Sequence, residues 1–158
     1  MATFIGDFVC KADAKGRIVL PSIFKKVMNA MKENRFVVRK DLYTNCLLVY
    51  PYPDWEAHVH DIRSKVNVYD KNQNMVYRQY VRAAAEVSYD ANGRMLIPKR
   101  LMDKIAVEKE VVLVGVDNKI ELWSKAEFEN GGMDDDELAA KMQTFWGENI
   151  NEDRKEDE

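Results

Sequence analysis

The stretch "DAKGRIVLP", Asp13 to Pro21, decides the fold, because a close copy, "DANGRMLIP", returns at Asp90 to Pro98. The aspartate, glycine, arginine and proline of the two copies match in register. In a DxxG turn the aspartate carboxylate can accept a backbone N–H two residues on, and the glycine can take the positive φ that closes a hairpin. The recurrence of this turn, in the same setting, indicates two related halves.

Similar elements surround each copy of the turn. The segment "SIFKKVMNAMK" follows the first copy and predicts a short helix with Ser22 as its N-cap, and "KRLMDKIA" follows the second. Each half therefore predicts a strand, the turn, a strand, one short helix and two further strands. The last two strands are expected at residues 36–40 and 46–51 in the first half, and at 110–116 and 119–124 in the second.

One half alone is too small to be stable. A unit of about 50 residues buries only roughly 60% of its surface, so two such units must share a core. The sequence thus predicts an α+β, β-rich fold in which two tandem repeats form a pseudo-dimer within one chain. Aromatic residues at matching places in the two halves are expected in its core or interface; they are Tyr50, Trp55, Trp123 and Phe128.

Helical segments link and follow the two halves. Apolar spacing predicts linking helices at 54–66 and 72–87, broken near residues 67–72, and a C-terminal helix at 134–146. The polar residues 147–158 are expected to be disordered. The predicted divisions are a first repeat at 1–53, linking helices at 54–84, a second repeat at 85–130, and an acidic helix and tail at 131–158.

Charge is unevenly distributed along the chain. The net charge is −3, but ten acidic and three basic residues from Asp134 to Glu158 give that segment −7 and leave +4 on the rest. A mildly basic body can accept a nucleic-acid partner.

The sequence contains no run of 18 apolar residues and no signal-peptide pattern. Cys10 and Cys46 could form a disulfide but fit buried reduced thiols better. We therefore expect a cytosolic protein.

The arginine after each glycine has two interpretations. Arginine is suited to bidentate contact with phosphate or with a guanine edge, so Arg17 and Arg94 could bind DNA. They could instead pair with Asp13 and Asp90 and hold each loop together, and spacing alone does not decide between these roles. The first loop adds Lys15 at its tip. Further cations lie nearby in sequence; they are Lys11, Lys25, Lys26, Lys99 and Arg100.

The doubled motif, with "LLVYPYPDWE" after the first copy and "VVLVGVDNKIELWSKAEFE" after the second, closely resembles the MraZ family over roughly residues 4 to 130. The resemblance implies the swapped-hairpin, AbrB-like fold and a bacterial transcriptional regulator of the division and cell-wall gene cluster. Such a protein would bind short guanine-containing direct repeats in double-stranded DNA, form a ring-like homo-oligomer (an octamer or dodecamer) and associate with the nucleoid.

The family's DNA-contacting motif maps onto both loops of this chain. It implies DNA binding by Lys15, Arg17 and Arg94. The residues that would shape the loops are Asp13, Gly16, Asp90 and Gly93. The second loop departs from the first, because Asn92 stands where the first loop has a lysine, which makes its contribution to binding less certain.

Other functions have weaker support in the sequence. His58 and His60 are two apart on a predicted helix, so they would point to different sides as solvated residues and make a poor metal pair. No glycine-rich phosphate loop with a Walker lysine is present, so we expect no enzyme activity, cofactor, metal or small-molecule substrate.

An antitoxin-like interaction module is the main alternative. Antitoxins share the swapped-hairpin architecture and hold a partner protein with a disordered C-terminal segment, although they usually carry one hairpin unit rather than two. The acidic tail here could play that role, could compete with DNA for the basic loops, or could act only as a solubilising segment.

Overall fold

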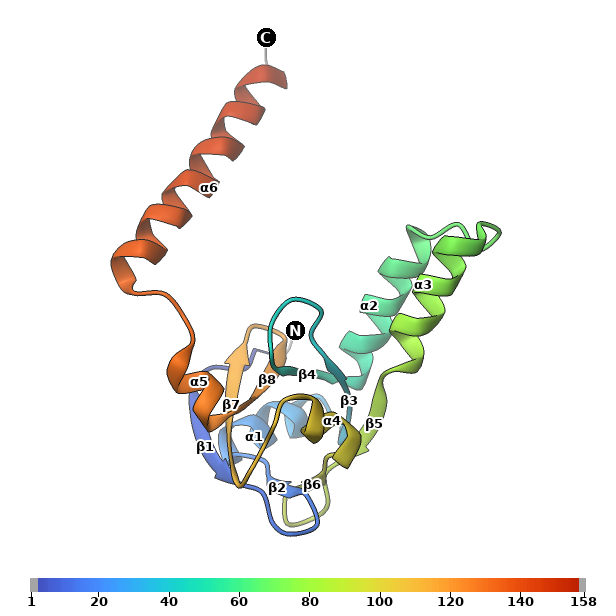
Figure 1. Cartoon of the computed structure of the whole chain (residues 1–158), viewed down its shortest axis with the longest axis vertical. Helices are drawn as coiled ribbons and strands as arrows, with labels where there is room; N and C mark the ends of the chain where they lie inside the picture. The colour runs from blue at the N-terminus through green and yellow to red at the C-terminus, as the bar shows by residue number, and fades with distance from the viewer. Residues whose placement is uncertain (1–2, 157–158) are drawn as a thin grey trace. The chain divides into compact units, whose positions relative to one another are not determined.

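The computed structural model describes residues 3–156, with side chains described for residues 3–147 (Figure 1). The chain divides into two compact units, Met1–Phe128 and Glu129–Glu158. The first unit contains all eight strands that the structure describes.

The first unit is built on a six-stranded antiparallel sheet and a separate two-stranded ribbon. The ribbon pairs β2 (Arg17–Val19) with β6 (Arg94–Leu96). The six strands of the large sheet, in order across it, are β1 (Asp7–Lys11), β7 (Glu110–Val116), β8 (Lys119–Ser124), β4 (Leu47–Pro51), β3 (Arg35–Lys40) and β5 (Ala85–Ser88).

The two halves exchange strands reciprocally. Strand β1 of the first half pairs with β7 of the second, with Cys10 opposite Val111. Strand β5 of the second half pairs with β3 of the first, with Phe36 opposite Val87. The β2–β6 ribbon takes one strand from each half. The predicted α+β pseudo-dimer of swapped hairpins is therefore confirmed.

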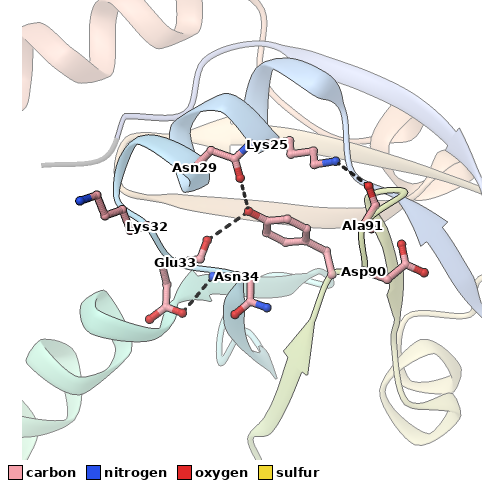
Figure 2. A pocket seen from close by; sticks show the side chains of 8 residues that line it. Lys25, Asn29, Lys32, Glu33, Asn34, Asp90 and Ala91 are labelled. Atoms are coloured by element: carbon pink, nitrogen blue, oxygen red, sulfur yellow. Dashed lines mark hydrogen bonds between the residues drawn. The ribbon is translucent and has the colours of Figure 1, made fainter.

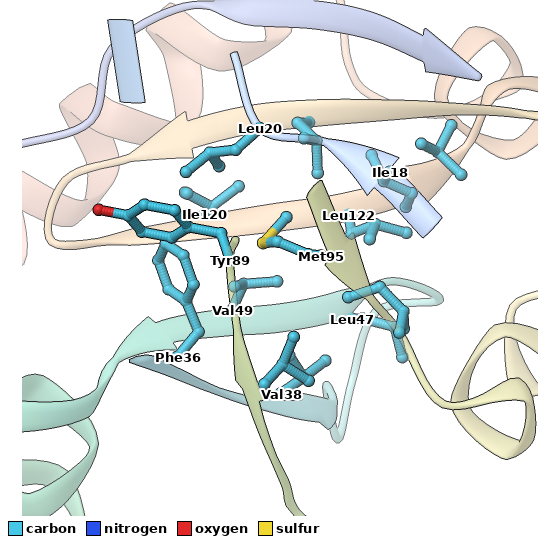
Figure 3. Close-up of a cluster of buried hydrophobic side chains, with 14 of the residues drawn as sticks. Ile18, Leu20, Phe36, Val38, Leu47, Val49, Tyr89, Met95, Ile120 and Leu122 are labelled. Atoms are coloured by element: carbon cyan, nitrogen blue, oxygen red, sulfur yellow. The ribbon is translucent and has the colours of Figure 1, made fainter. Parts of the chain in front are cut away.

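A single core joins the ribbon to the large sheet (Figure 3). Ile18 and Met95 are opposite one another in the ribbon, and both are fully buried. They pack in one cluster with Leu47 and Val49 of β4 and with Ile120 of β8. Strand β4 is buried along its whole length, which explains why "LLVYP" is a continuous apolar run rather than an alternating one.

A short helix follows each ribbon strand. Helix α1 (Ser22–Ala30) and helix α4 (Lys99–Lys104) each bury an apolar face in the shared core. The prediction that Ser22 caps α1 is wrong, because Pro21 is the N-cap and no side chain caps this end. Proline has a fixed φ suited to the entry of a helix, and its carbonyl accepts the backbone N–H groups of Phe24 and Lys25, both at 3.0 Å.

The linking helices are α2 (Tyr52–Ser64) and α3 (Lys71–Arg82), and they contribute to a second apolar cluster with Val37, Leu48 and Tyr50 of the sheet. Helix α3 ends five residues before the predicted boundary at residue 87. The reason is tertiary: residues 85–88 form β5, and Val87 is buried beside β3. The apolar spacing within one segment carries no information about pairing with a distant strand, so it could not predict where the helix ends.

The prediction that His58 is a solvated helix residue is also wrong. Its imidazole is half-buried, its ring stacks on Tyr50, and its Nε2 lies 2.7 Å from the hydroxyl of Tyr80. Burial lowers the pKa of His58, which favours the neutral ring. His60 is exposed, as predicted.

Both cysteines are free thiols, as the sequence predicts. Cys46 is fully buried, and this burial raises the pKa of its thiol to about 12. Cys10 is half-buried on β1.

Helix α5 (Lys125–Asn130) follows β8, and helix α6 (Asp135–Glu156) forms most of the second unit. The acidic first turn of α6 lies where the helix dipole favours negative charge, and the Asp134 carboxylate accepts the backbone N–H of Glu137 at 2.8 Å. The sequence predicts disorder for residues 147–158, but α6 continues to Glu156, so this prediction is wrong for residues 147–156; residues 157–158 lie outside the described range.

Among the described residues, no helix has the length and apolar character needed to cross a bilayer.

Gly115 of β7 tests how tightly the N-terminal segment is packed. A Cβ there would lie 2.4 Å from the backbone carbonyl of Phe4, which leaves no room for a methyl group. We expect Gly115→Ala to lower the free energy of unfolding by about 1–3 kcal/mol, the usual cost of overpacking. Urea unfolding measures this change, with Gly147→Ala as the control, because a Cβ at Gly147 meets nothing within 4 Å. Equal stability of the two variants would contradict this close approach of Phe4 to Gly115.

Candidate nucleic-acid interface

The first DxxGR loop connects β1 to β2 and is closed by its aspartate. The Oδ1 atom of Asp13 accepts the backbone N–H groups of Lys15 and Arg17, both at 2.9 Å. The backbone N–H of Gly16 donates to the Asp13 carbonyl at 3.0 Å, and Gly16 has a φ of 83°. Glycine adopts this left-handed conformation without a Cβ penalty, which explains the residue choice.

The second loop repeats this geometry. The Oδ1 atom of Asp90 accepts the backbone N–H groups of Asn92 at 2.9 Å and Arg94 at 3.0 Å. Gly93 has a φ of 77°, and its N–H donates to the Asp90 carbonyl at 2.9 Å. Both loops therefore have the same turn structure, which is closed by hydrogen bonds within each five-residue DxxGR motif.

Each loop is also held by the opposite half of the chain. The Ile97 N–H donates to the Gly16 carbonyl at 3.3 Å, and the Leu20 N–H donates to the Gly93 carbonyl at 2.7 Å. Together with the β2–β6 pairing, these reciprocal bonds place the two loops side by side at one end of the first unit (Figure 1). The structure thus brings together Asp13, Lys15, Gly16 and Arg17 with Asp90, Gly93 and Arg94.

The ribbon has one buried and one exposed face. Ile18 and Met95 point into the core, so the alternation of a strand turns their neighbours outward. The exposed face carries Arg17 opposite Leu96 and Val19 opposite Arg94. Val19 and Leu96 are each 55% exposed, and neither was singled out from the sequence. The signal that could have identified them is the period of two along a strand, which places Val19 on the same face as Arg17 and Leu96 on the same face as Arg94.

The arginines pair with the loop aspartates and still reach solvent. The Arg17 Nε donates to Asp13 Oδ2 at 2.7 Å, with 37% of the arginine side chain exposed. The Arg94 Nε lies 3.4 Å from Asp90 Oδ2, with 40% of that side chain exposed. This second pair lacks hydrogen-bond geometry, so within the described residues the buried Arg94 Nε has an ion-pair partner but no hydrogen-bond acceptor. The side-chain ion pair is therefore the looser one in the second loop, whereas the backbone bonds that close the two loops are alike.

Both aspartates are held in the ionised form. The largest cause for Asp13 is the hydrogen bond from the backbone N–H of Arg17, which lowers the pKa of the carboxyl. The backbone N–H of Arg94 lowers the pKa of Asp90 in the same way. The largest single cause of each lowered pKa is thus a backbone donor, and the paired guanidinium lowers the pKa further.

Of the further cations that lie near the two motifs in sequence, Lys25 and Arg100 contact backbone carbonyls, one at a loop and one elsewhere. Lys25 of α1 donates from Nζ to the Ala91 carbonyl of the second loop at 3.1 Å. It lines a cavity of about 510 Å³ with Asn29, Lys32, Glu33, Asn34, Tyr89, Asp90 and Ala91 (Figure 2). Arg100 instead donates to the Ala83 and Ala84 carbonyls at the end of α3, at 3.1 and 3.4 Å. The sequence places both near the motif but does not distinguish them.

Within the part of the chain that the structure describes, no group of three or more His, Cys, Asp or Glu side chains is arranged to hold a metal ion.

Comparison with known proteins identifies extensive similarity. A family model described as "MraZ protein, putative antitoxin-like" matches residues 3–79 and 81–142. The protein named Transcriptional regulator MraZ of Bacteroides thetaiotaomicron is 34% identical over 157 residues, covering 99% of this chain and 98% of that protein. Proteins of the same name from Bacteroides fragilis (34% over 148 residues; 94% of each chain) and Christiangramia forsetii (36% over 129 residues; 82% and 83%) are also similar.

The loop aspartates make a testable prediction about pH. Because ionisation is favoured in the folded loop, Asp13 and Asp90 should titrate below their ordinary pKa of 3.8. Their contribution to loop stability is present above that pKa and is lost as the pH falls through the lower folded value. Carboxyl ¹³C shifts measured against pH test this. In Arg17→Ala the pKa of Asp13 should stay lowered, because alanine keeps the backbone donor; a return to 3.8 would contradict this assignment.

Proposed function

The chain belongs to the MraZ family, and on this premise we propose that it is a DNA-binding transcriptional regulator that reads short guanine-containing direct repeats with its two DxxGR loops. The observation that carries the proposal is the pair of exposed arginines on a ribbon built from both halves. The major groove of B-DNA admits a two-stranded β-ribbon. The shared name of the similar proteins supports the regulatory part of the proposal.

The ion pairs prepare the arginines for base recognition. A guanidinium has five N–H donors, and Asp13 accepts one of them, from the Nε of Arg17. The terminal nitrogens can then form a bidentate contact with the O6 and N7 atoms of a guanine, worth about 1–3 kcal/mol of discrimination. Holding the side chain beforehand reduces the entropy lost on binding. The two interpretations of the arginines, loop clamp and DNA contact, are therefore compatible.

Val19 and Leu96 complete the reading surface. Each lies beside an arginine on the exposed face of the ribbon. Apolar side chains in the major groove recognise the methyl group of thymine. In this proposal the four outward side chains recognise base edges, whereas Lys15 at the first loop tip neutralises phosphate.

Self-association would multiply weak contacts. The two loops of one chain present few cations, and binding through phosphate neutralisation alone is weak and sensitive to salt. A ring-like homo-oligomer, an octamer or dodecamer, would place several ribbons on successive direct repeats, and avidity could then add a factor of about 10²–10⁴. We further propose that these repeats lie in the promoter of the division and cell-wall gene cluster, so that the protein acts in the cytoplasm at the nucleoid.

The antitoxin-like alternative is supported by the description of the matching family model. In this second proposal the acidic C-terminal region holds a partner protein while the loops bind DNA. Copurification of one stoichiometric partner would favour it, whereas a homogeneous self-assembly would favour the first proposal.

Removing both arginines tests the proposed interface. We expect Arg17→Ala with Arg94→Ala to abolish binding to DNA from the protein's own upstream region in a mobility-shift assay, and to leave assembly, measured by light scattering, unchanged. The backbone bonds that close the loops remain in this variant.

A matched control removes two exposed arginines from the linking helices, with Arg63→Ala and Arg78→Ala. This control should bind DNA nearly as well as the parent. If the double loop variant stays folded and binds as tightly as the control, the loops are not the DNA interface.

A further inference from the structure

We propose that Lys25 supplies the second loop with the cation that the first loop carries at Lys15, and that it contacts a DNA phosphate there. This inference rests on the proposed DNA-binding function. It assigns a DNA contact to helix α1, outside the DxxGR motif.

The two halves differ at this position. Phe24 and Met28 of α1 correspond to Leu101 and Ile105 of the second half, and all four side chains are buried. The same alignment places Lys25 opposite Met102, which is buried in the shared core. Helix α4 therefore has a methionine where α1 has a lysine.

The loop tips differ in the opposite sense. The first loop has Lys15 at its exposed tip, where the second has the neutral Asn92. The strand exchange brings α1 to the second loop, as the Leu20–Gly93 hydrogen bond shows. The loop without a lysine in its own sequence thus receives one from the other half.

The contact between Lys25 and the second loop is direct (Figure 2). Its Nζ donates to the Ala91 carbonyl at 3.1 Å, across 66 positions in sequence. The same Nζ lies 4.0 Å from the position that a Cβ would take at Gly93. An ammonium has three N–H donors, so this bond fixes the charge beside the loop and leaves donors that can bind an anion.

The surroundings of Lys25 favour an anionic ligand. The two acids that line the same cavity are paired with arginines: Glu33 accepts two hydrogen bonds from the Arg35 guanidinium, and Asp90 Oδ2 lies 3.4 Å from the Arg94 Nε. No acidic residue lies in the first turn of α1. A lysine is a compact point charge that binds phosphate without base selectivity, so Lys25 should strengthen binding to all sequences alike.

The salt dependence of binding tests this role. On a duplex with one repeat, a plot of log K against log [salt] has a negative slope. Lys25→Met should reduce the magnitude of this slope by about 0.9, the value for one phosphate contact, and should weaken binding roughly eightfold at 0.1 M salt. Methionine is the residue at the matching position of α4, and it keeps an unbranched side chain while removing the charge. Lys26→Met is the control, because it removes the same charge from the adjacent exposed position.

A rescue variant separates charge from loop support. Adding Asn92→Lys to Lys25→Met restores a lysine at the second loop tip, and it should recover the slope of the parent. The inference is overturned if Lys25→Met has the slope of Lys26→Met, or if it weakens binding with an unchanged slope that Asn92→Lys does not affect. Circular dichroism of each variant confirms folding, and Lys25→Gln replaces Lys25→Met if that variant fails to fold.

Failure of the underlying function has a different signature. If the parent protein does not bind the duplex, or if Arg17→Ala with Arg94→Ala binds as well as the parent, then the proposed function is wrong. If the parent binds through these arginines and Lys25→Met is indistinguishable from Lys26→Met, only the role of Lys25 is wrong.

Discussion

Reciprocal strand exchange is the constraint on which the rest of the molecule depends. Strand β1 has its sheet partner in the second half, and β5 has its partner in the first. Neither half can satisfy its backbone hydrogen bonds alone, and an unpaired buried peptide group costs about as much as a lost hydrogen bond. The two loops are therefore placed together as a consequence of folding, and their juxtaposition needs no ligand.

The same exchange makes the exposed face of the ribbon rigid. Ile18 and Met95, on the reverse face, are fully buried in the core shared with the large sheet. Protein cores are close-packed, so the ribbon cannot rotate or slide without disturbing that packing. The local turn bonds of Asp13 and Asp90 then orient the arginines on a fixed base. Stability and recognition thus use opposite faces of the same short strands.

The sequence was sufficient for those features that rest on local chemistry and on the repeat. A DxxG turn requires a carboxylate and a positive-φ glycine, and two copies in one small chain require a shared core. Features set by distant partners were not predicted. Helix α3 ends before the predicted boundary because residues 85–88 pair with β3 as a strand. His58 is half-buried because it contacts Tyr50 and Tyr80. Lys25 reaches Ala91 only after the halves interlock, so its contact has no short-range signal.

The two loops have similar backbones but unlike cations. Lys15 lies within the first loop, Lys25 contacts the second from outside, and only Arg17 forms a close hydrogen bond with its aspartate. A dimer with true twofold symmetry cannot distinguish the two directions along a duplex, and for this reason such dimers favour palindromes. Because the halves are fused in one chain, each can change independently, so the surface that they form is asymmetric and has a direction along the duplex. Such a directional surface suits DNA in which every repeat has the same orientation.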